Sequence, residues 1–361
     1  MPELAPFLKS LLSAPGLSGY EKPVAGLIEE KWRPLVDQIS RSRLGSLHAL
    51  KKGTSATAKR PAIMVATHMD AIGLMVTQIV DGGLLHIASI GGIDARVMPG
   101  TPVGVHATGK TATEALFGVV VQPPARSLPA SLGDGPVGLN HLLVDLGLPH
   151  NRVLEKVQVG DLISFATEPT ELAGEVISGH SLDNRVSVAA LTVALEELQG
   201  KSHAWDVWAV ATAQEEETLG GATTSAFDLH PDLALAVDVT FAKGPGANDW
   251  QTFPLGKGPT LGYGPNLHPF LHNRLKELAD RLEIPYNVEV LPRHSGTDAY
   301  AMQVAAEGIP TMVIGIPLRY MHTPVEVVAY KDIQRAGRLI AEFIAALEMD
   351  FVEKITWDDE K

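Results

Sequence analysis

Residues 61–70 read PAIMVATHMD, and this stretch indicates both the fold class and the position of a candidate site. The run from Pro61 to Thr67 is brief, apolar and bounded by chain breakers, which predicts a buried strand. His68 and Asp70 follow it directly and lie two positions apart, so both side chains can point the same way from an extended segment. A carboxylate that accepts a hydrogen bond from the far ring nitrogen orients a histidine as a metal ligand.

The same arrangement recurs at three other predicted strands. Glu215 and Glu216 directly follow the run WDVWAVATA, Asp238 lies at the end of LALAVDV, and His322 lies a few residues beyond TMVIGI. In open α/β sheets, sites form outside the carboxyl ends of the strands. Four strands are therefore predicted to bring imidazole and carboxylate groups to one edge of one sheet.

Strands and helices alternate in the parts of the chain that carry these residues. Further helices are predicted at 6–12, 23–32, 186–198 (amphipathic), 270–282, 299–306 and 333–347, and further strands at 44–50, 205–213, 233–239 and 311–316. This alternation is typical of an α/β fold, with a mostly parallel sheet covered by helices on both faces.

The sequence pattern between residues 73 and 166 differs from the rest of the chain. Short β-prone runs (LMVTQIV, LLHIASI, VGVHA, FGVVVQ and VQVGDLISFA) alternate there with Gly, Pro and Asp turns, and only residues 139–148 resemble a short helix. This pattern predicts a small all-β domain, a barrel or a sandwich. We therefore expect a catalytic α/β domain formed by residues 1–72 and 167–361 and interrupted by a β-domain at 73–166.

Composition narrows the function classes. The formal net charge of −13 argues against a nucleic-acid partner, which needs a clustered basic surface. Cysteine is absent, so candidate metal ligands are His, Asp and Glu, the set that suits catalytic zinc. No window approaches 18 uninterrupted apolar residues, which predicts no membrane span. The start Met1-Pro2-Glu3-Leu4 lacks the features of a signal peptide, so a cytoplasmic location is expected.

Each candidate also has an ordinary structural interpretation. Taken alone, Asp183 is better explained as the N-cap of the following helix than as a carboxylate that bridges two metals. The run Glu215-Glu216-Glu217 is either a solvated acidic patch or a ligand beside a general base. His322 taken alone resembles a surface residue. Asp238 is the most informative, because a lone carboxylate in an apolar strand must pair, coordinate a metal or lie at the strand mouth.

The ordered set of motifs resembles metallopeptidase family 42, the tetrahedral (dodecameric) aminopeptidases and glutamyl aminopeptidases. The matching segments are Thr67-His68-Met69-Asp70, Gly179-His180-Ser181-Leu182-Asp183-Asn184-Arg185, Gln214-Glu215-Glu216, Asp238, Ser295-Gly296-Thr297-Asp298-Ala299 and Met321-His322-Thr323. They run across essentially the whole chain. The segment Glu217-Thr218-Leu219-Gly220-Gly221 departs from the Val-Gly-Leu-Arg-Gly common in the family, which bears on local packing or assembly rather than on the ligands.

The resemblance implies a phosphorylase/peptidase-like catalytic domain that holds two divalent metal ions, zinc or cobalt first and manganese or nickel as alternatives. It assigns the first metal to His68 and Asp238, the second to Glu216 and His322, and a bridging role to Asp183. Glu215 is then the general base that activates a metal-bridging water for attack on the first peptide bond, and Asp70 orients His68.

The implied substrates are short peptides, cleaved at their N-terminal residue. The implied assembly is a homo-oligomer, a tetrahedral dodecamer built through the β-domain. The pocket for the substrate side chain is expected to be walled by residues 241–251 and 291–299.

Three rival functions follow from the same residues. A two-metal deacylase or carboxypeptidase needs a cation for the substrate carboxylate, for which Arg293 or Arg319 is available, and Lys243 is a further cation for an acidic side chain. A non-enzymatic scaffold predicts the loss of a ligand or of the base, and none is missing. A cellulase needs two carboxylates that flank a sugar without a metal, which the histidines argue against.

Overall fold

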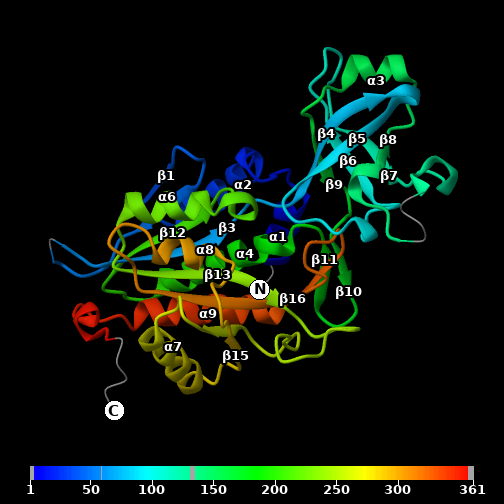
Figure 1. Ribbon diagram of the computed structural model, residues 1–361. Coiled ribbons are helices and arrows are strands. Elements are labelled where there is room, and N and C mark those ends of the chain that lie inside the picture. Colours follow the sequence, from blue (N-terminus) through cyan, green and yellow to red (C-terminus); the bar gives the residue numbers. More distant parts are fainter. Residues whose placement is uncertain (1–3, 58, 131–134, 357–361) are drawn as a thin grey trace.

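The computed structural model describes residues 4–57, 59–130 and 135–356. These residues form an α/β body and a smaller β-barrel that stands apart from it, joined by the chain before β4 and after β9 (Figure 1).

The body is built on one large sheet. Its strands follow the order β1-β2-β12-β3-β13-β16-β17-β11-β10, with β14 and β15 attached beside β16. The central strands β12, β3, β13 and β16 are mutually parallel. The flanking strands pair antiparallel, except that β14 and β15 are parallel to each other. The bounds are β1 Gln38–Arg41, β2 Leu47–Lys51, β3 Ala62–His68, β10 Thr170–Leu172, β11 Val176–Gly179, β12 Asp206–Thr212, β13 Leu233–Phe241, β14 Thr260–Tyr263, β15 Asn287–Val290, β16 Thr311–Arg319 and β17 Glu326–Ala329.

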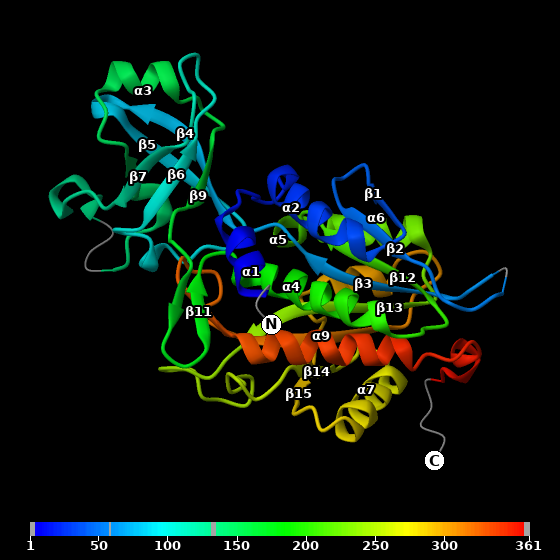
Figure 2. The same cartoon turned by 180° about the vertical axis from the view of Figure 1, so that it is seen from behind.

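Helices cover both faces of this sheet. On one face α4 packs on β3 and β13, and the helices α1, α2 and α9 lie beside it on the same face, while α6 and α8 pack together on the other face (Figure 2). The bounds are α1 Leu4–Ser13, α2 Lys22–Trp32, α4 Leu182–Glu197, α5 Glu215–Thr218, α6 Gly220–Leu229, α7 Pro269–Arg281, α8 Asp298–Gln303 and α9 Tyr330–Ala345. The continuous apolar runs of the central strands are explained by this burial on both faces.

The second body is a closed antiparallel barrel of order β4-β5-β8-β7-β6-β9 with its own apolar core. Closure leaves no strand edge unpaired. The bounds are β4 Gly73–Val80, β5 Leu84–Ile90, β6 Pro102–His106, β7 Leu116–Val121, β8 Leu143–Asp145 and β9 Leu162–Phe165, with α3 at His150–Lys156. The prediction of a mostly parallel α/β fold interrupted by a small all-β domain is confirmed, and of the two forms expected for that domain the structure shows the barrel.

Two local predictions were wrong. Residues 139–148 are helical only in a single 3₁₀ turn at Leu139–His141. Leu143–Asp145 is strand β8, which pairs with β5 and β7 and completes the barrel, and the next α-helix lies at His150–Lys156. Hydrogen-bonding partners far along the chain decide this segment, and local periodicity does not contain them. Helix α4 is also not amphipathic as predicted. It is buried on nearly every side because the sheet and the neighbouring helices surround it.

Several short strands were missed, among them β1, β10, β11, β14, β15 and β17. They lie at the margins of the sheet and have only 3–4 residues each, too few for an alternation to be read. Among the described helices, none combines the length and apolarity that crossing a membrane requires.

Candidate active site

The predicted site residues meet at the carboxyl edge of the parallel strands. His68 is the last residue of β3, Asp238 lies in the last half of β13, and Glu215 and Glu216 open the short helix α5 that follows β12. His322 lies in the loop after β16, and Asp183 enters from the first turn of α4. The crossover connections of a parallel sheet bring these segments together at one edge, as expected from the positions of the strands.

Two groups of side chains have the spacing of metal sites. The first is His68, Asp183 and Asp238, and the second is Asp183, Glu216 and His322; in each, the potential ligand atoms lie within 4.8 Å of one another. Asp183 belongs to both groups.

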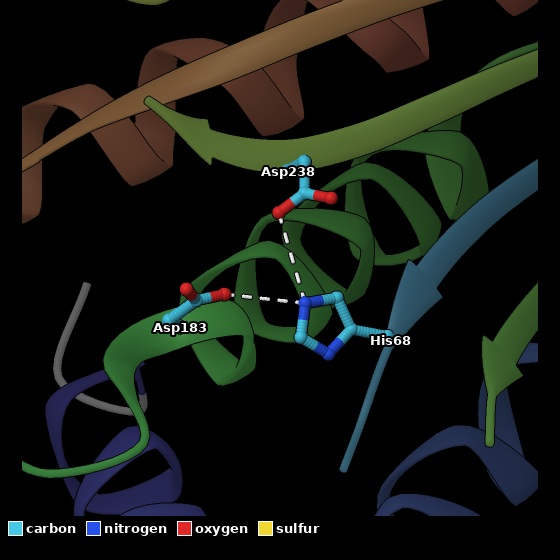
Figure 3. A group of neighbouring side chains, drawn as sticks. All are labelled: His68, Asp183 and Asp238. Atoms are coloured by element: carbon cyan, nitrogen blue, oxygen red, sulfur yellow. Dashed lines mark ion pairs between the residues drawn. The ribbon is translucent and has the colours of Figure 1, made fainter. Parts of the chain in front are cut away.

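In the first group, the side chains converge on one imidazole nitrogen (Figure 3). His68 Nε2 lies 3.2 Å from Asp183 Oδ1 and 3.7 Å from Asp238 Oδ1. All three side chains are buried. In the second group, His322 Nε2 lies 3.4 Å from Asp183 Oδ2 and 3.5 Å from Glu216 Oε2. The two oxygens of Asp183 therefore face different histidines.

Asp183 does not cap α4. The N-cap residue is Ser181, and no side-chain hydrogen bond caps this end of the helix. The N-cap role that the sequence around Asp183 favours is therefore wrong, because the Asp183 carboxylate points toward His68 and His322.

The rest of the Asp183-Asn184-Arg185 motif holds neighbouring segments in place. Asn184 Nδ2 donates to the carbonyl of Val237, directly before Asp238, at 2.9 Å. Arg185 is buried, and its guanidinium donates to the carbonyl of Met69, between the two residues of the His-x-Asp pair. It also donates to three carbonyls around the end of α1, those of Leu11, Ala14 and Gly16.

Glu215 and Asp70 lie beside the first group. Glu215 Oε2 is 3.7 Å from His68 Nε2, and Asp70 Oδ1 is 3.4 Å from His68 Nδ1. Asp70 also accepts hydrogen bonds from the backbone N–H groups of Glu215 and Glu216, at 3.1 and 3.2 Å. It is thus placed to orient His68 and also fixes the start of α5.

Two buried carboxylates that sequence reasoning missed support the same loops. Glu326 on β17 accepts the N–H of Asp183 at 3.1 Å and that of His322 at 2.9 Å. Asp298, at the start of α8, accepts the hydroxyl of Thr212 at the end of β12, at 2.5 Å. Asp298 belongs to a segment that had been recognised as a motif, but nothing in the sequence near Glu326 indicates its role.

Residues 217–221, the segment that departs from the family pattern, contact the barrel through Glu217. Glu217 Oε1 accepts the N–H of Gly91, in the loop after β5, at 2.6 Å. The next residue, Gly92, lies so close to His322 that an added Cβ would be 3.0 Å from its Nδ1. The barrel therefore contributes backbone to the edge of the site.

The crowding of negative charge shifts the protonation of this site. Burial raises the pKa of Glu215 to about 9 and that of Asp238 to about 8, and His68 opposes both shifts. Burial also raises the pKa of Glu216 well above its usual range, and neighbouring Asp183 adds to this. Burial lowers the pKa of His68, but the carboxylates of Glu215, Asp183 and Asp70 outweigh it and hold that pKa well above its usual range. A cation in this space relieves the repulsion among the carboxylates.

A cavity of about 840 Å³ opens beside the two groups. Its walls include Phe241 to Gln251 and Leu291 to Thr297 in part, as expected from their order along the chain. Thr240, Glu289 and Tyr300 also line it and had not been predicted. None of the described residues that line this cavity is a lysine or an arginine.

Comparison with solved structures places the α/β body and barrel in a known class. A TET aminopeptidase from the marine sediment archaeon Thaumarchaeota archaeon SCGC AB-539-E09 superposes with a TM-score of 0.91 at 30% identity, over 98% of this chain and 100% of that one. The TET1 peptidase of Pyrococcus horikoshii, which can assemble into a tetrahedron or a large octahedral shell, superposes with a TM-score of 0.80 at 28% identity, over 96% and 100% of the two chains. The fold is that of the TET peptidases.

Sequence comparison agrees. The model of the M42 glutamyl aminopeptidase family matches residues 45–339. A lysyl aminopeptidase of Pyrococcus furiosus is 35% identical over 349 residues, covering 95% of this chain and 98% of that protein. The chain belongs to the M42 glutamyl aminopeptidase family and is an aminopeptidase.

Proposed function

We propose that this aminopeptidase depends on two divalent metal ions, held by His68 and Asp238 on one side and by Glu216 and His322 on the other, with Asp183 shared. The observation that carries the proposal is the position of Asp183, whose two oxygens lie 3.2 and 3.4 Å from the Nε2 atoms of two different histidines. One carboxylate between two imidazoles is the arrangement that a bridged pair of metals needs.

The residues present fit such ions. The donors are imidazole nitrogens and carboxylate oxygens, which suit zinc, cobalt, manganese or nickel. Glu216 Oε1 is buried and has no hydrogen-bond partner among the described residues, although a buried carboxylate oxygen normally has one. Zinc or cobalt is the first expectation for the identity of the metal.

The chemistry divides between the ions and the chain. Two metals bound here would activate a water and polarise the carbonyl of the first peptide bond. Glu215 is the proposed general base: its carboxylate takes a proton from the attacking water at Oε2 and delivers it to the leaving amine. Asp70 holds the ring of His68 and the backbone of Glu215 in place through the contacts described above. The buried position of these groups limits access of bulk water.

Substrate and assembly follow from the relatives. We propose short peptides with a free N-terminus as substrates, because the relatives are aminopeptidases and a cavity of about 840 Å³ has room for a few residues but not for a folded protein. We also propose that residues 73–166 act as an inserted assembly domain, and that the chain forms a tetrahedral dodecamer like one of the shells described for Pyrococcus horikoshii TET1.

The two-metal deacylase or carboxypeptidase is less well supported. It requires a cation for a substrate carboxylate, yet Arg293 and Arg319 are not among the residues that line the cavity. Arg319 instead donates from Nε to the carbonyl of Lys243 at 2.6 Å.

The test is hydrolysis of a panel of aminoacyl-p-nitroanilides by purified protein. Each is measured as isolated, after EDTA, and after zinc or cobalt is added back, with Glu215→Gln as the inactive control. We expect metal-dependent release from free-amino substrates and a loss of at least about 100-fold in kcat for Glu215→Gln. Cleavage of N-acylated substrates in place of free-amino ones would contradict the proposal and favour the deacylase.

A further inference from the structure

Two carboxylates that the proposed chemistry does not use line the cavity beside the candidate metal groups: Asp249 is exposed at its rim, and Glu289 lies deeper. Glu289 lies on β15, half-buried, and lines the same cavity as His68 and Asp183. It is absent from both candidate metal groups. A carboxylate placed in a cavity wall, away from the reacting groups, is available to contact the rest of the substrate.

Glu289 is held in a fixed position. Its Oε1 accepts the hydroxyl of Thr240 and its Oε2 accepts the hydroxyl of Thr260, both at 2.6 Å. A glycine, Gly315, provides the space: a Cβ there would lie 2.2 Å from Thr260 Oγ1 and 3.0 Å from Glu289 Oε2. Two hydrogen bonds leave about half of the acceptor capacity of an ionised carboxylate free. Glu289 is therefore positioned and still able to accept hydrogen bonds.

Its distance from the candidate metal groups matches a long side chain. Thr240 follows the candidate ligand Asp238 by two residues on β13, so both side chains lie on one face, about 7 Å apart along the strand. Glu289 contacts Thr240 directly. A lysine, whose ammonium ends a four-carbon stem, is long enough to span from the cleavage site to this position.

The electrostatic surroundings favour a cation over an anion. No lysine or arginine occurs among the described residues that line the cavity, and a second carboxylate, Asp249, lies at its exposed rim. Burial raises the pKa of Glu289, and the two threonine hydroxyls oppose this by favouring the ionised form. An ammonium or guanidinium group on the substrate would supply the countercharge that Glu289 lacks among these lining residues.

Aromatic side chains in the cavity wall can contact the apolar part of a bound side chain. Tyr300 and Trp250 line the cavity and are exposed to 43% and 62%, so their rings remain free to cover a bound side chain. Long cationic side chains bury their methylene stems along apolar surface and keep the charged head at a polar partner.

We propose that Glu289 is a specificity-determining residue and selects substrates whose first residue carries a cationic side chain, lysine or arginine. This inference rests on the proposed aminopeptidase site and specifies its substrate class. It also accounts for the two threonines and the glycine that surround this carboxylate, which catalysis does not require.

The experiment compares lysyl- and norleucyl-p-nitroanilide, which differ in the terminal ammonium. We expect the wild type, loaded with zinc or cobalt, to have a kcat/KM for the lysyl substrate at least about 10-fold above that for the norleucyl one, the size of one hydrogen bond to a charged group. Glu289→Gln should reduce this ratio about 10-fold or more. Glu277→Gln, the same change on the exposed face of α7, should leave the ratio as it is.

Calorimetric binding of L-lysine and L-norleucine to the same metal-loaded proteins gives a readout that does not depend on turnover. Tighter binding of lysine, lost in Glu289→Gln, supports the inference. If the wild type has equal kcat/KM values for the two substrates and equal affinities for the two amino acids, the inference is wrong. This outcome can be read from the wild type alone, even if Glu289→Gln does not fold. Absence of hydrolysis of every free-amino substrate would instead contradict the proposed function, and calorimetry would still decide the role of Glu289.

Discussion

At the scale of single residues, Glu326 supports the site without lining the cavity. Its two oxygens accept the backbone N–H groups of Asp183 and His322, which belong to segments from different parts of the chain. Burial raises the pKa of Glu326 well above its usual range, so an ionised carboxylate at this position costs free energy. In return, Glu326 holds two candidate ligands at a fixed separation.

Glu326→Gln replaces one of these acceptors by an amide N–H₂ group that faces a backbone N–H. We expect metal affinity or activity to fall about 10- to 100-fold, as for other residues that orient ligands. Metal content after dialysis, with the circular dichroism spectrum as a check of folding, measures this. Glu175→Gln, on an exposed residue, is the matched control, and equal metal content in the two variants would refute the positioning role.

His180 predicts a pH dependence of stability. It is buried, contacts Ser181 Oγ at 2.7 Å, and burial, with Arg185 nearby, lowers its pKa to about 3. The unfolded chain takes up this proton near pH 6.5 while the folded chain does not, so the stabilisation present above pH 6.5 is lost as the pH falls toward 3.

The expected contribution is a slope of up to about 1.4 kcal/mol per pH unit in the free energy of unfolding between those limits. Urea denaturation at several pH values measures it. His180→Gln should flatten the slope, whereas His230→Asn, at an exposed histidine, should not. An unchanged slope in His180→Gln would show that His180 does not stay neutral in the folded protein.

At the scale of elements, the close contact of α4 and α9 depends on Gly337. An added Cβ there would lie 2.5 Å from the carbonyl oxygen of Ala190 and 2.7 Å from Cβ of Val193. Because α4 carries Asp183 at its start, the packing of this pair bears on the site as well as on the core.

Gly337→Ala should therefore destabilise the protein by about 1–3 kcal/mol, since overpacking outweighs the better helix propensity of alanine. Gly26→Ala in α2 is the opposite case: nothing lies within 4 Å of the added Cβ, and we expect a gain of about 0.5–1 kcal/mol. Chemical denaturation of both variants tests the pair. Similar changes in the same direction would show that helix propensity, and not packing, dominates at Gly337.

The site loops also share a backbone conformation that the strands do not have. Ser181, Gln214 and His322 all adopt left-handed φ values, of 60°, 60° and 61°. Such conformations are unfavourable for residues other than glycine and persist where the surroundings determine them, commonly at functional sites. Here the surroundings are the carboxylates of Glu21, which accepts the N–H of Gln214, and of Glu326.

At the scale of the whole molecule, the barrel presents an apolar face that is exposed among the residues the structure describes. Phe117 and Val119 on β7 point to the same side and are exposed to 75% and 37%. Exposed apolar side chains that gather into a contiguous patch often mark a surface that another protein covers. This face is the first candidate for a contact in the proposed shell.

Phe117→Asp places a charge on that face. We expect a smaller assembly in analytical ultracentrifugation, with the barrel and the α/β body still folded by circular dichroism. Val159→Asp, at a barrel residue 65% exposed, controls for surface charge as such. A sedimentation profile unchanged by Phe117→Asp would exclude this face from the assembly.

Local sequence pattern is enough to predict the fold class and the set of candidate residues. Buried strands are short continuous apolar runs, and a charged residue directly after such a run lies at the sheet edge, so the positions of His68, Glu215 and Asp238 follow from local pattern. The histidines and carboxylates, without cysteine, limit the metal chemistry. These properties depend on neighbours in the chain and can be read from it.

Which of these groups face one another depends on how distant segments pack together. Asp183 alone is a plausible helix cap, and it faces two histidines only because α4 begins beneath the ends of β3 and β16. Glu326 and Glu289 lie on strands of four residues. Glu326 accepts the N–H of Asp183, and Glu289 accepts the hydroxyls of Thr240 and Thr260, and all three partners are far away in the chain. The role of a carboxylate depends on what surrounds it, and that is set by packing between distant segments.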